Sequence, residues 1–195
     1  MKVRPALAKG FLRLSGWALE GEHPTARAYV LIAAPHTTNW DLLYFLAHAW
    51  ALGISPSWIG KHTLFSGPLG PVMRWLGGVP VDRARAGGLV AQLAQAFQRE
   101  PDLVLTVPPE GTRSRAPFWK SGFYQIARAA KVPIVMGFLD YDRRRGGLGP
   151  TLIPGDDLRA DMDAIRAFYA DKRGKHPECF GDVRLAEEGA RAGSD

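Results

Sequence analysis

Two residues, His36 and Asp41, carry the side chains in this sequence that are best suited to move a proton. They stand five positions apart in the stretch A-A-P-H-T-T-N-W-D, directly after the apolar run Tyr29–Ala34. A carboxylate that accepts a hydrogen bond from one imidazole nitrogen fixes the tautomer and leaves the other nitrogen free as a base. Five helical residues rotate by about 140°, so the two side chains can meet only if His36 lies in a turn and Asp41 begins the next helix.

The same stretch also has an ordinary structural interpretation. Thr37, Thr38 and Asn39 are residue types that cap the N-termini of helices. Asp41 would suit the first turn of a helix, because the helix dipole favours negative charge there. From this stretch alone, a capped turn and a proton-handling pair both stay open.

A second polar stretch, P-P-E-G-T-R-S-R, follows the apolar run Leu103–Val107. Gly111 would allow the backbone to approach a ligand closely. Arg113 and Arg115, with Lys120 just beyond, offer charge-assisted contacts to a phosphate. A solvated basic loop is the alternative. A third stretch, residues 61–83, is rich in basic and apolar residues and ends in V-D-R, which could hold a phosphate or form a surface ion pair.

Several classes of catalytic and cofactor motif are absent from the sequence. It contains no G-x-S-x-G elbow, no phosphate-binding loop, no G-x-G-x-x-G fingerprint and no H-E-x-x-H or C-x-x-C metal pattern. His176 and Cys179 are close in sequence but lie in an acidic segment without a preceding strand, so we interpret them as incidental. We therefore expect no metal and no cofactor, and a nucleophile that is a hydroxyl of the substrate.

Apolar runs that read as strands alternate with helical patterns, which predicts a single α/β domain with a mixed, largely parallel sheet flanked by helices. Ligand sites in such sheets form beyond the carboxyl ends of the strands. His36 and Glu110 each follow a strand, so we expect them at the same edge. The expected strands are 29–34, 103–107 and 132–139, the expected helices are 41–53, 89–100, 121–130 and 157–172, a helical turn is expected at 72–76, and 141–150 is expected to be a basic, glycine-rich turn.

The charge is unevenly distributed over the 195 residues, which carry a net charge of +6. Residues 36–155 contain thirteen Lys and Arg against seven acidic residues, whereas residues 156–195 contain seven against ten. The positive part coincides with the motifs and would attract phosphates, in lipids, small molecules or nucleic acid. Nucleic acid is disfavoured because no nucleic-acid-binding motif is present. The single cysteine excludes an internal disulfide and fits a reducing compartment.

The N-terminal residues 1–22 predict a basic amphipathic helix, with an apolar stripe opposite basic side chains. Such a helix can lie in a bilayer interface or pack on the core of the domain, and both alternatives stay open. The uncharged segment 42–60 is long enough to be weighed as a membrane span, but Gly53 and Pro56 interrupt it, so we interpret it as a helix and a short strand. The division expected is a helix at 1–22, a main domain at 23–175 and an acidic tail at 176–195.

Four motifs, in order, resemble those of the glycerophospholipid acyltransferase family, whose best-known members are the 1-acylglycerol-3-phosphate acyltransferases. The resemblance covers roughly residues 29–140 and departs from the family pattern at Pro35, Pro80, Pro108 and Met136. The matches are H-x-x-x-x-D at His36–Asp41, a block from Lys61 to Val81-Asp82-Arg83, P-E-G-T-R-S at Pro109–Ser114 and V-P-I-V at Val132–Val135.

The resemblance implies a glycerol-phosphate acyltransferase-like αβ fold and a fatty acyl transfer. The donor would be acyl-CoA or acyl-carrier protein, and the acceptor would be the hydroxyl of a lysophospholipid such as 1-acylglycerol 3-phosphate. Other acceptors, a lyso-aminolipid or glycerol 3-phosphate, stay open, as does a non-catalytic lipid-binding module. The resemblance also implies a cytoplasmic protein attached peripherally to the membrane.

The resemblance further implies roles for individual residues. His36 would be the general base and Asp41 would orient it. The remaining candidates would bind substrate: Lys61, Arg83 and Arg113 would hold an anionic head group, and Glu110, Gly111 and Thr112 would shape the acceptor pocket.

Overall fold

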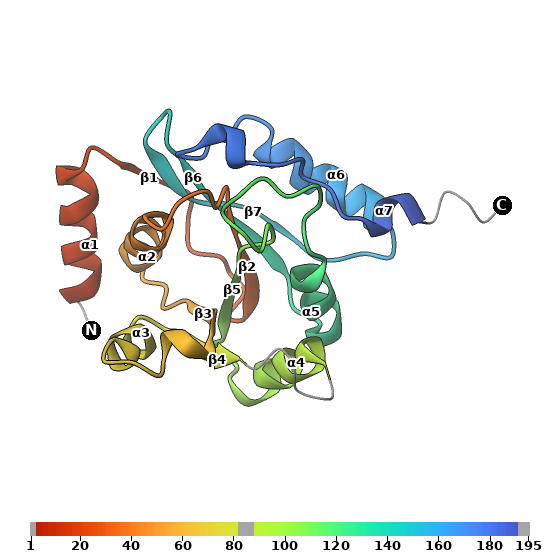
Figure 1. Ribbon diagram of the computed structural model, residues 1–195, viewed down its shortest axis with the longest axis horizontal. Coiled ribbons are helices and arrows are strands. Elements are labelled where there is room, and N and C mark those ends of the chain that lie inside the picture. Colours follow the sequence, from red (N-terminus) through yellow and green to blue (C-terminus); the bar gives the residue numbers. More distant parts are fainter. Residues whose placement is uncertain (1–2, 82–87, 191–195) are drawn as a thin grey trace.

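A seven-stranded sheet forms the centre of the protein, whose structure is a computed structural model that describes residues 3–81 and 88–190 (Figure 1). The strand order is β1-β7-β6-β2-β5-β3-β4. Neighbouring strands run parallel except β6 and β7, which are antiparallel. The strands are β1 (Ala18–Glu20), β2 (Tyr29–Ala34), β3 (Ser57–Lys61), β4 (Gly78–Val81), β5 (Val104–Val107), β6 (Ile134–Asp140) and β7 (Arg145–Leu152). The predicted mixed, largely parallel α/β sheet is confirmed.

Helices cover both faces of the sheet, so its central strands are mostly apolar, with Thr106 in β5 and Asp140 at the end of β6 as buried polar residues. One core lies between the sheet and α4, α5 and α6, and the other lies between the sheet and α1 and α2. The helices are α1 (Val3–Leu14), α2 (Asp41–Ala51), α3 (Gly70–Trp75), α4 (Leu89–Arg99), α5 (Gly122–Ala130), α6 (Leu158–Tyr169) and α7 (Glu187–Ala190), with 3₁₀ turns at His62–Leu64 and Pro177–Cys179.

The turn expected at 141–150 is present at 141–144, but residues 145–150 belong to strand β7, so that part of the prediction was wrong. Its glycines are needed for close packing. A Cβ on Gly147, where φ is +149°, would lie 1.9 Å from the carbonyl oxygen of Glu20 in β1, and a Cβ on Gly146 would lie 2.8 Å from the ring of buried His48. Glycine at these positions lets β1 and α2 approach strand β7. Local turn propensity gives no indication of this requirement, because β1 and α2 are distant in sequence.

Helix α1 is shorter than predicted, because the chain turns at Gly16 and enters β1 at Ala18. Its apolar residues are divided between the core and the surface: Phe11 packs against the core, whereas Val3, Leu7 and Leu14 are 68%, 69% and 91% exposed. The side of the helix that contains Ala8 and Leu12 packs against α2. Of the two alternatives for this helix, packing on the core of the domain is confirmed for its inward side, and contact of its outward residues with a bilayer stays a prediction. Within the described ranges, no helix combines the length and the apolar character that crossing a bilayer requires.

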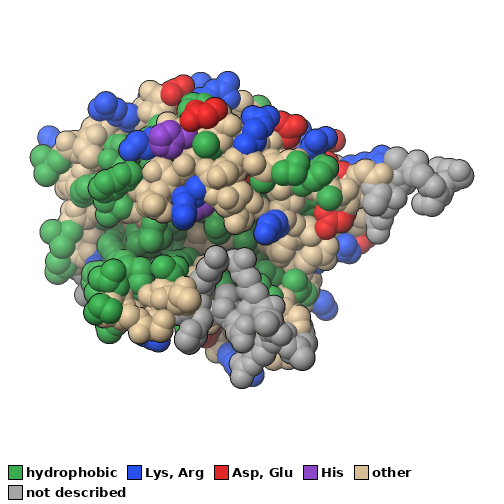
Figure 2. Space-filling model, in the orientation of Figure 1, with side chains coloured by type: hydrophobic (Ala, Val, Ile, Leu, Met, Phe, Trp, Pro, Cys, Tyr) green, Lys and Arg blue, Asp and Glu red, His purple; other side chains and the backbone are tan. Residues whose placement is uncertain are grey.

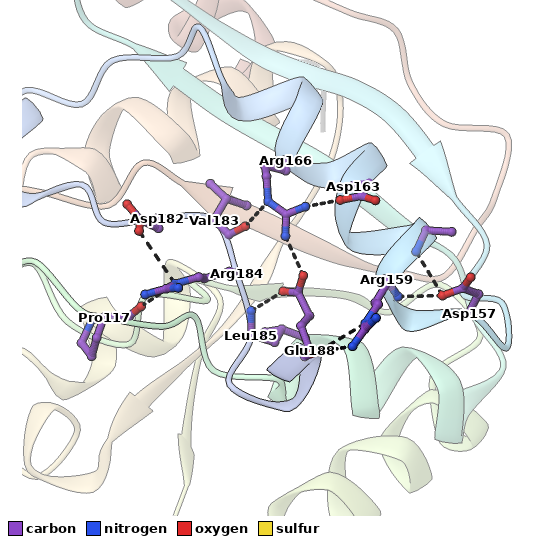
Figure 3. A network of polar contacts seen from close by, with 11 residues as sticks. Pro117, Asp157, Arg159, Asp163, Arg166, Asp182, Val183, Arg184, Leu185 and Glu188 are labelled. Atoms are coloured by element: carbon purple, nitrogen blue, oxygen red, sulfur yellow. Dashed lines mark hydrogen bonds and ion pairs between the residues drawn. The ribbon is translucent and has the colours of Figure 1, made fainter. Parts of the chain in front are cut away.

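The C-terminal tail is held to α6 by a network of arginines (Figure 3). The Arg166 guanidinium donates to the Val183 carbonyl at 3.0 Å and pairs with Glu188 at 2.6 Å. Arg159 donates to the carbonyl oxygen of Glu188 at 3.0 Å. The described part of the tail, residues 176–190, is therefore a packed element, although its composition predicts loose order.

Candidate active site

His36 and Asp41 meet where β2 ends and α2 begins. His36 lies in the turn after β2, and Asp41 is the first residue of α2. The Nδ1 atom of His36 is 3.2 Å from Oδ2 of Asp41, and the side chains are 22% and 5% exposed. The expected geometry, a turn histidine beside a carboxylate in the first helical turn, is present.

The Asp41 carboxylate holds the turn together. Its Oδ2 accepts hydrogen bonds from the backbone N–H groups of Thr37 and Thr38, at 2.8 and 2.9 Å. The expectation that Thr37–Asn39 cap α2 with their side chains was wrong, since the cap residue is Trp40 and it makes no side-chain cap bond. Instead, the N–H groups of Thr37 and Thr38 point at Asp41. Among the described residues, the one side-chain bond from this turn to the start of α2 is a long one, in which Thr38 Oγ1 accepts the Trp40 N–H at 3.4 Å.

This arrangement occupies Nδ1 of His36, and no residue that the structure describes forms a hydrogen bond to Nε2. A carboxylate that already accepts two backbone N–H groups is an acceptor, so Nδ1 carries the proton that faces it. Nε2 is then the unprotonated nitrogen of a neutral ring and is able to take a proton from a substrate hydroxyl. Asp41 would stabilise the imidazolium that results.

Glu110 lies beyond the carboxyl end of β5, next to β2, and ties the two motifs together. Its Oε1 accepts the backbone N–H of His36 at 2.6 Å. The side chain is only 2% exposed, and Oε2 has no hydrogen-bond partner among the described residues. Burial raises the pKa of Glu110 to about 8; the bond from His36 opposes this rise and the nearby charge of Asp41 adds to it. A contact between Glu110 and the acceptor stays a prediction, whereas its bond to the backbone of His36 is present.

We expect Glu110→Gln to change how stability depends on pH. Because the folded protein binds a proton at Glu110 up to about pH 8 and the unfolded chain releases it near 4.5, the native state loses stability as pH rises through this window. Gln keeps the acceptor for His36 and cannot ionise. The variant should match wild type near pH 5 and be more stable at pH 9, by an amount on the order of a few kcal/mol. Urea unfolding at the two pH values measures this, and parallel curves for both proteins would contradict it.

The loop after Glu110 carries exposed basic side chains. Gly111 has φ +67°, and a Cβ there would lie 2.8 Å from Cε of Lys120, so the lysine side chain lies directly over this turn. Thr112 and Arg113 are exposed, and Arg113 makes no ion pair with any residue that the structure describes. Arg115, by contrast, points to the C-terminal tail, where it contacts Asp182 at 3.4 Å and the carbonyl of Phe180 at 3.2 Å.

The side chains of the two further candidates, Lys61 and Arg83, lie outside what the structure describes. Lys61 is the last residue of β3, but its side chain is not among those described. Arg83 lies in residues 82–87, outside the described ranges. Their predicted contacts with an anionic head group stay predictions.

The structure brings in two contacts that sequence reasoning missed. The Tyr141 hydroxyl donates to Oδ1 of Asp41 at 2.7 Å, across 100 residues of sequence. The backbone N–H of His176 donates to Thr37 Oγ1 at 3.2 Å, so the tail lies against the turn that holds His36. Tyr141 directly follows β6 and could have been found by extending to that strand the rule that sites gather at carboxyl ends. His176 gave no such signal.

Comparison with known proteins identifies the class of site. A family model described as Acyltransferase matches residues 18–136, which is more than half of the chain and includes His36, Asp41 and Glu110. The chain belongs to the acyltransferase family. This confirms the resemblance found in the motifs, and the protein is an acyltransferase enzyme.

A solved structure supports the fold of the acyltransferase. The chain is similar to the 1-acyl-sn-glycerophosphate acyltransferase of Thermotoga maritima, with a TM-score of 0.59 over 84% of this chain and 73% of that chain. The sequence identity is 18%, so the likeness shows a common fold. No curated protein matches the sequence.

Proposed function

We propose that this acyltransferase moves a fatty acyl group from acyl-CoA or acyl-carrier protein to the free hydroxyl of a lysophospholipid such as 1-acylglycerol 3-phosphate. The observation that carries the proposal is the His36–Asp41 pair at the carboxyl edge of the sheet, in which Nδ1 of His36 faces Asp41 and no described residue forms a hydrogen bond to Nε2. The similar Thermotoga enzyme is described as acting on 1-acyl-sn-glycerophosphate, which supports this acceptor.

In the proposed reaction His36 acts as general base. Nε2 removes the proton of the acceptor hydroxyl as its oxygen attacks the thioester carbonyl, and the protonated ring then gives the proton to the leaving thiolate. Proton transfer of this kind contributes about 10²–10⁴-fold. The substrate supplies the nucleophile and the thioester supplies the activated acyl group, so the reaction needs no cofactor beyond the acyl donor.

The acceptor is proposed to carry a phosphate or another anionic head group. Arg113 is exposed and is not engaged by a described carboxylate, and Lys120 lies over the neighbouring Gly111 turn. A guanidinium and an ammonium group in the loop that follows Glu110 suit an anionic oxygen of the acceptor. Lys61 and Arg83 are proposed to contribute further positive charge.

A panel of acceptors tests the proposal. Purified protein is given one acyl thioester together with 1-acylglycerol 3-phosphate, glycerol 3-phosphate or a lyso-aminolipid, and release of free thiol is measured. Fastest release with the lysophospholipid supports the proposal. Preference for glycerol 3-phosphate or a lyso-aminolipid would move the same chemistry to that acceptor, and vesicle binding without any thiol release would indicate a lipid-binding module.

The protein is also proposed to sit on the membrane surface, where its lipid substrates are. The apolar stripe of α1 is exposed, and so are Leu69, Val72 and Trp75 on or next to α3. Arg4 joins the two helices by lying 4.5 Å from the ring centre of Trp75. Hydrophobic side chains gather on the side of the molecule that carries α1 and α3 (Figure 2). An apolar surface bordered by basic residues favours an anionic bilayer.

We expect Leu7→Glu to weaken binding to vesicles that contain anionic lipid. The substitution removes a 69% exposed apolar side chain from the surface and adds a charge that such lipid repels. The matched control is Ile153→Glu, which makes the same change at an 82% exposed residue just beyond β7. Co-sedimentation with vesicles should fall several-fold for Leu7→Glu alone. Equal losses for the two variants would exclude the α1 surface as the docking site.

A further inference from the structure

The hydroxyl of Tyr141 contacts the one oxygen of Asp41 that the catalytic turn leaves free. Oδ2 is taken by the backbone of Thr37 and Thr38 and by the His36 ring, whereas Oδ1 accepts only the Tyr141 hydroxyl among the described residues, at 2.7 Å. The carboxylate is buried. Its position relative to His36 is therefore fixed from two sides, by the turn on one oxygen and by Tyr141 on the other.

Tyr141 is itself held rigidly. Its backbone N–H donates to the carbonyl of Arg173 at 2.9 Å, and its ring packs edge-on against Trp17 with centroids 4.9 Å apart. Tyr44 completes the group, stacked on Trp17 at 4.5 Å. Burial and the bond to Asp41 hold the pKa of Tyr141 above its ordinary range, so the hydroxyl remains a donor at any working pH.

We propose that Tyr141 is a positioning residue for the acyl transfer, which completes a Tyr141–Asp41–His36 relay by holding the carboxylate in line with the imidazole. This rests on the proposed role of His36 as the base. Tyr141 touches Asp41 and not the substrate. By donating to Oδ1 it withdraws some negative charge from the carboxylate and so moderates how strongly Asp41 stabilises the protonated ring.

The proposed relay predicts a change in pH dependence, which would not be expected if Tyr141 only supported the fold. Without the Tyr141 hydroxyl, Asp41 holds more negative charge toward His36, so the protonated ring is favoured at higher pH. In Tyr141→Phe the acid limb of the kcat/KM profile is therefore expected to move to higher pH, by about half a unit. The kcat at the optimum is expected to fall about tenfold because the carboxylate is less well aligned, and the KM values should stay within about twofold.

The matched control is Tyr44→Phe. It deletes the same atom from the same aromatic group, but the Tyr44 hydroxyl makes no hydrogen bond with any described residue and does not touch Asp41. Its pH profile and kcat should equal those of wild type. Glu110, whose pKa burial raises to about 8, is present in all three proteins, so its contribution cancels in the comparison.

A second measurement needs no catalysis. The ring of His36 can be titrated by NMR in the free protein, and its titration should move to higher pH in Tyr141→Phe and stay in place in Tyr44→Phe. If the acyl transfer itself is not observed, the NMR arm still decides the relay. Identical titrations of wild type and Tyr141→Phe, or a loss of activity that follows only a loss of folded protein, would overturn the proposal.

Discussion

Replacement of His36 by Ala is expected to lower kcat by about 10²–10⁴-fold while the protein stays folded. Among the described residues the side chain makes one polar contact, to Asp41, and it is 22% exposed, so its loss leaves few polar groups unpaired. The backbone N–H that Glu110 accepts is retained in Ala. Thiol release from the acyl donor measures the activity, and thermal unfolding measures the fold.

His176→Ala is the matched control for this experiment. His176 also adjoins the catalytic turn, but only through its backbone, and its ring faces Glu178 at 3.7 Å. The control should keep wild-type turnover. If His36→Ala turned over as fast as His176→Ala in folded protein, His36 would not be the base and the reaction would need a different proton acceptor.

The sequence predicts the parts of the site that are local. His36 and Asp41 lie within six residues of each other, in a turn and in the first turn of the helix that follows it. The pitch of a helix is enough to decide where side chains so close in sequence can point. Glu110 was expected at the same edge because it also follows a strand, and the sheet places β5 directly beside β2. These predictions depend only on strand order at one edge and on the pitch of one helix.

The parts that could not be predicted depend on contacts between distant segments. Tyr141 reaches Asp41 because β6 pairs with β2, a pairing that no local pattern specifies. The glycines of β7 read as a turn, because the requirement that they satisfy, close approach of β1 and His48, lies outside their own segment. The burial of Glu110 is of the same kind, since a P-E-G-T turn reads as exposed, whereas the tertiary structure buries Pro109 and Glu110 and leaves Gly111 and Thr112 exposed.

The exposed residues of α1 show that a correctly predicted apolar helix face does not by itself reveal what covers that face. The pattern gives a helix with an apolar face, and either a core or a bilayer could cover it. Only the packing decides, because Ala8 and Leu12 already satisfy the contact with α2 and leave Val3, Leu7 and Leu14 outside.

Asp41→Asn should be nearly as damaging to catalysis as loss of His36, for a different reason. The amide is isosteric: its oxygen can accept from the N–H groups of Thr37 and Thr38, and its NH₂ group can face the Tyr141 hydroxyl, which then acts as acceptor. The fold should therefore persist. The variant lacks the charge that stabilises the imidazolium 3.2 Å away, an interaction on the order of a few kcal/mol at this partly buried site. We expect kcat to fall by about 10²–10⁴-fold and KM to change little, because Asp41 is too buried to touch substrate.

Asp161→Asn provides the control that separates charge from architecture. Asp161 accepts the same kinds of donor, the Tyr124 hydroxyl at 2.8 Å and the backbone N–H of Gly155 at 2.7 Å, but it lies on α6 without a histidine beside it. Both variants should lose a similar, small amount of stability in urea unfolding, and only Asp41→Asn should lose turnover. A fall in kcat that scaled with the loss of stability in both would mean that Asp41 only holds the turn. A fall confined to Asp41→Asn would mean that its charge acts on His36 during the proton transfer.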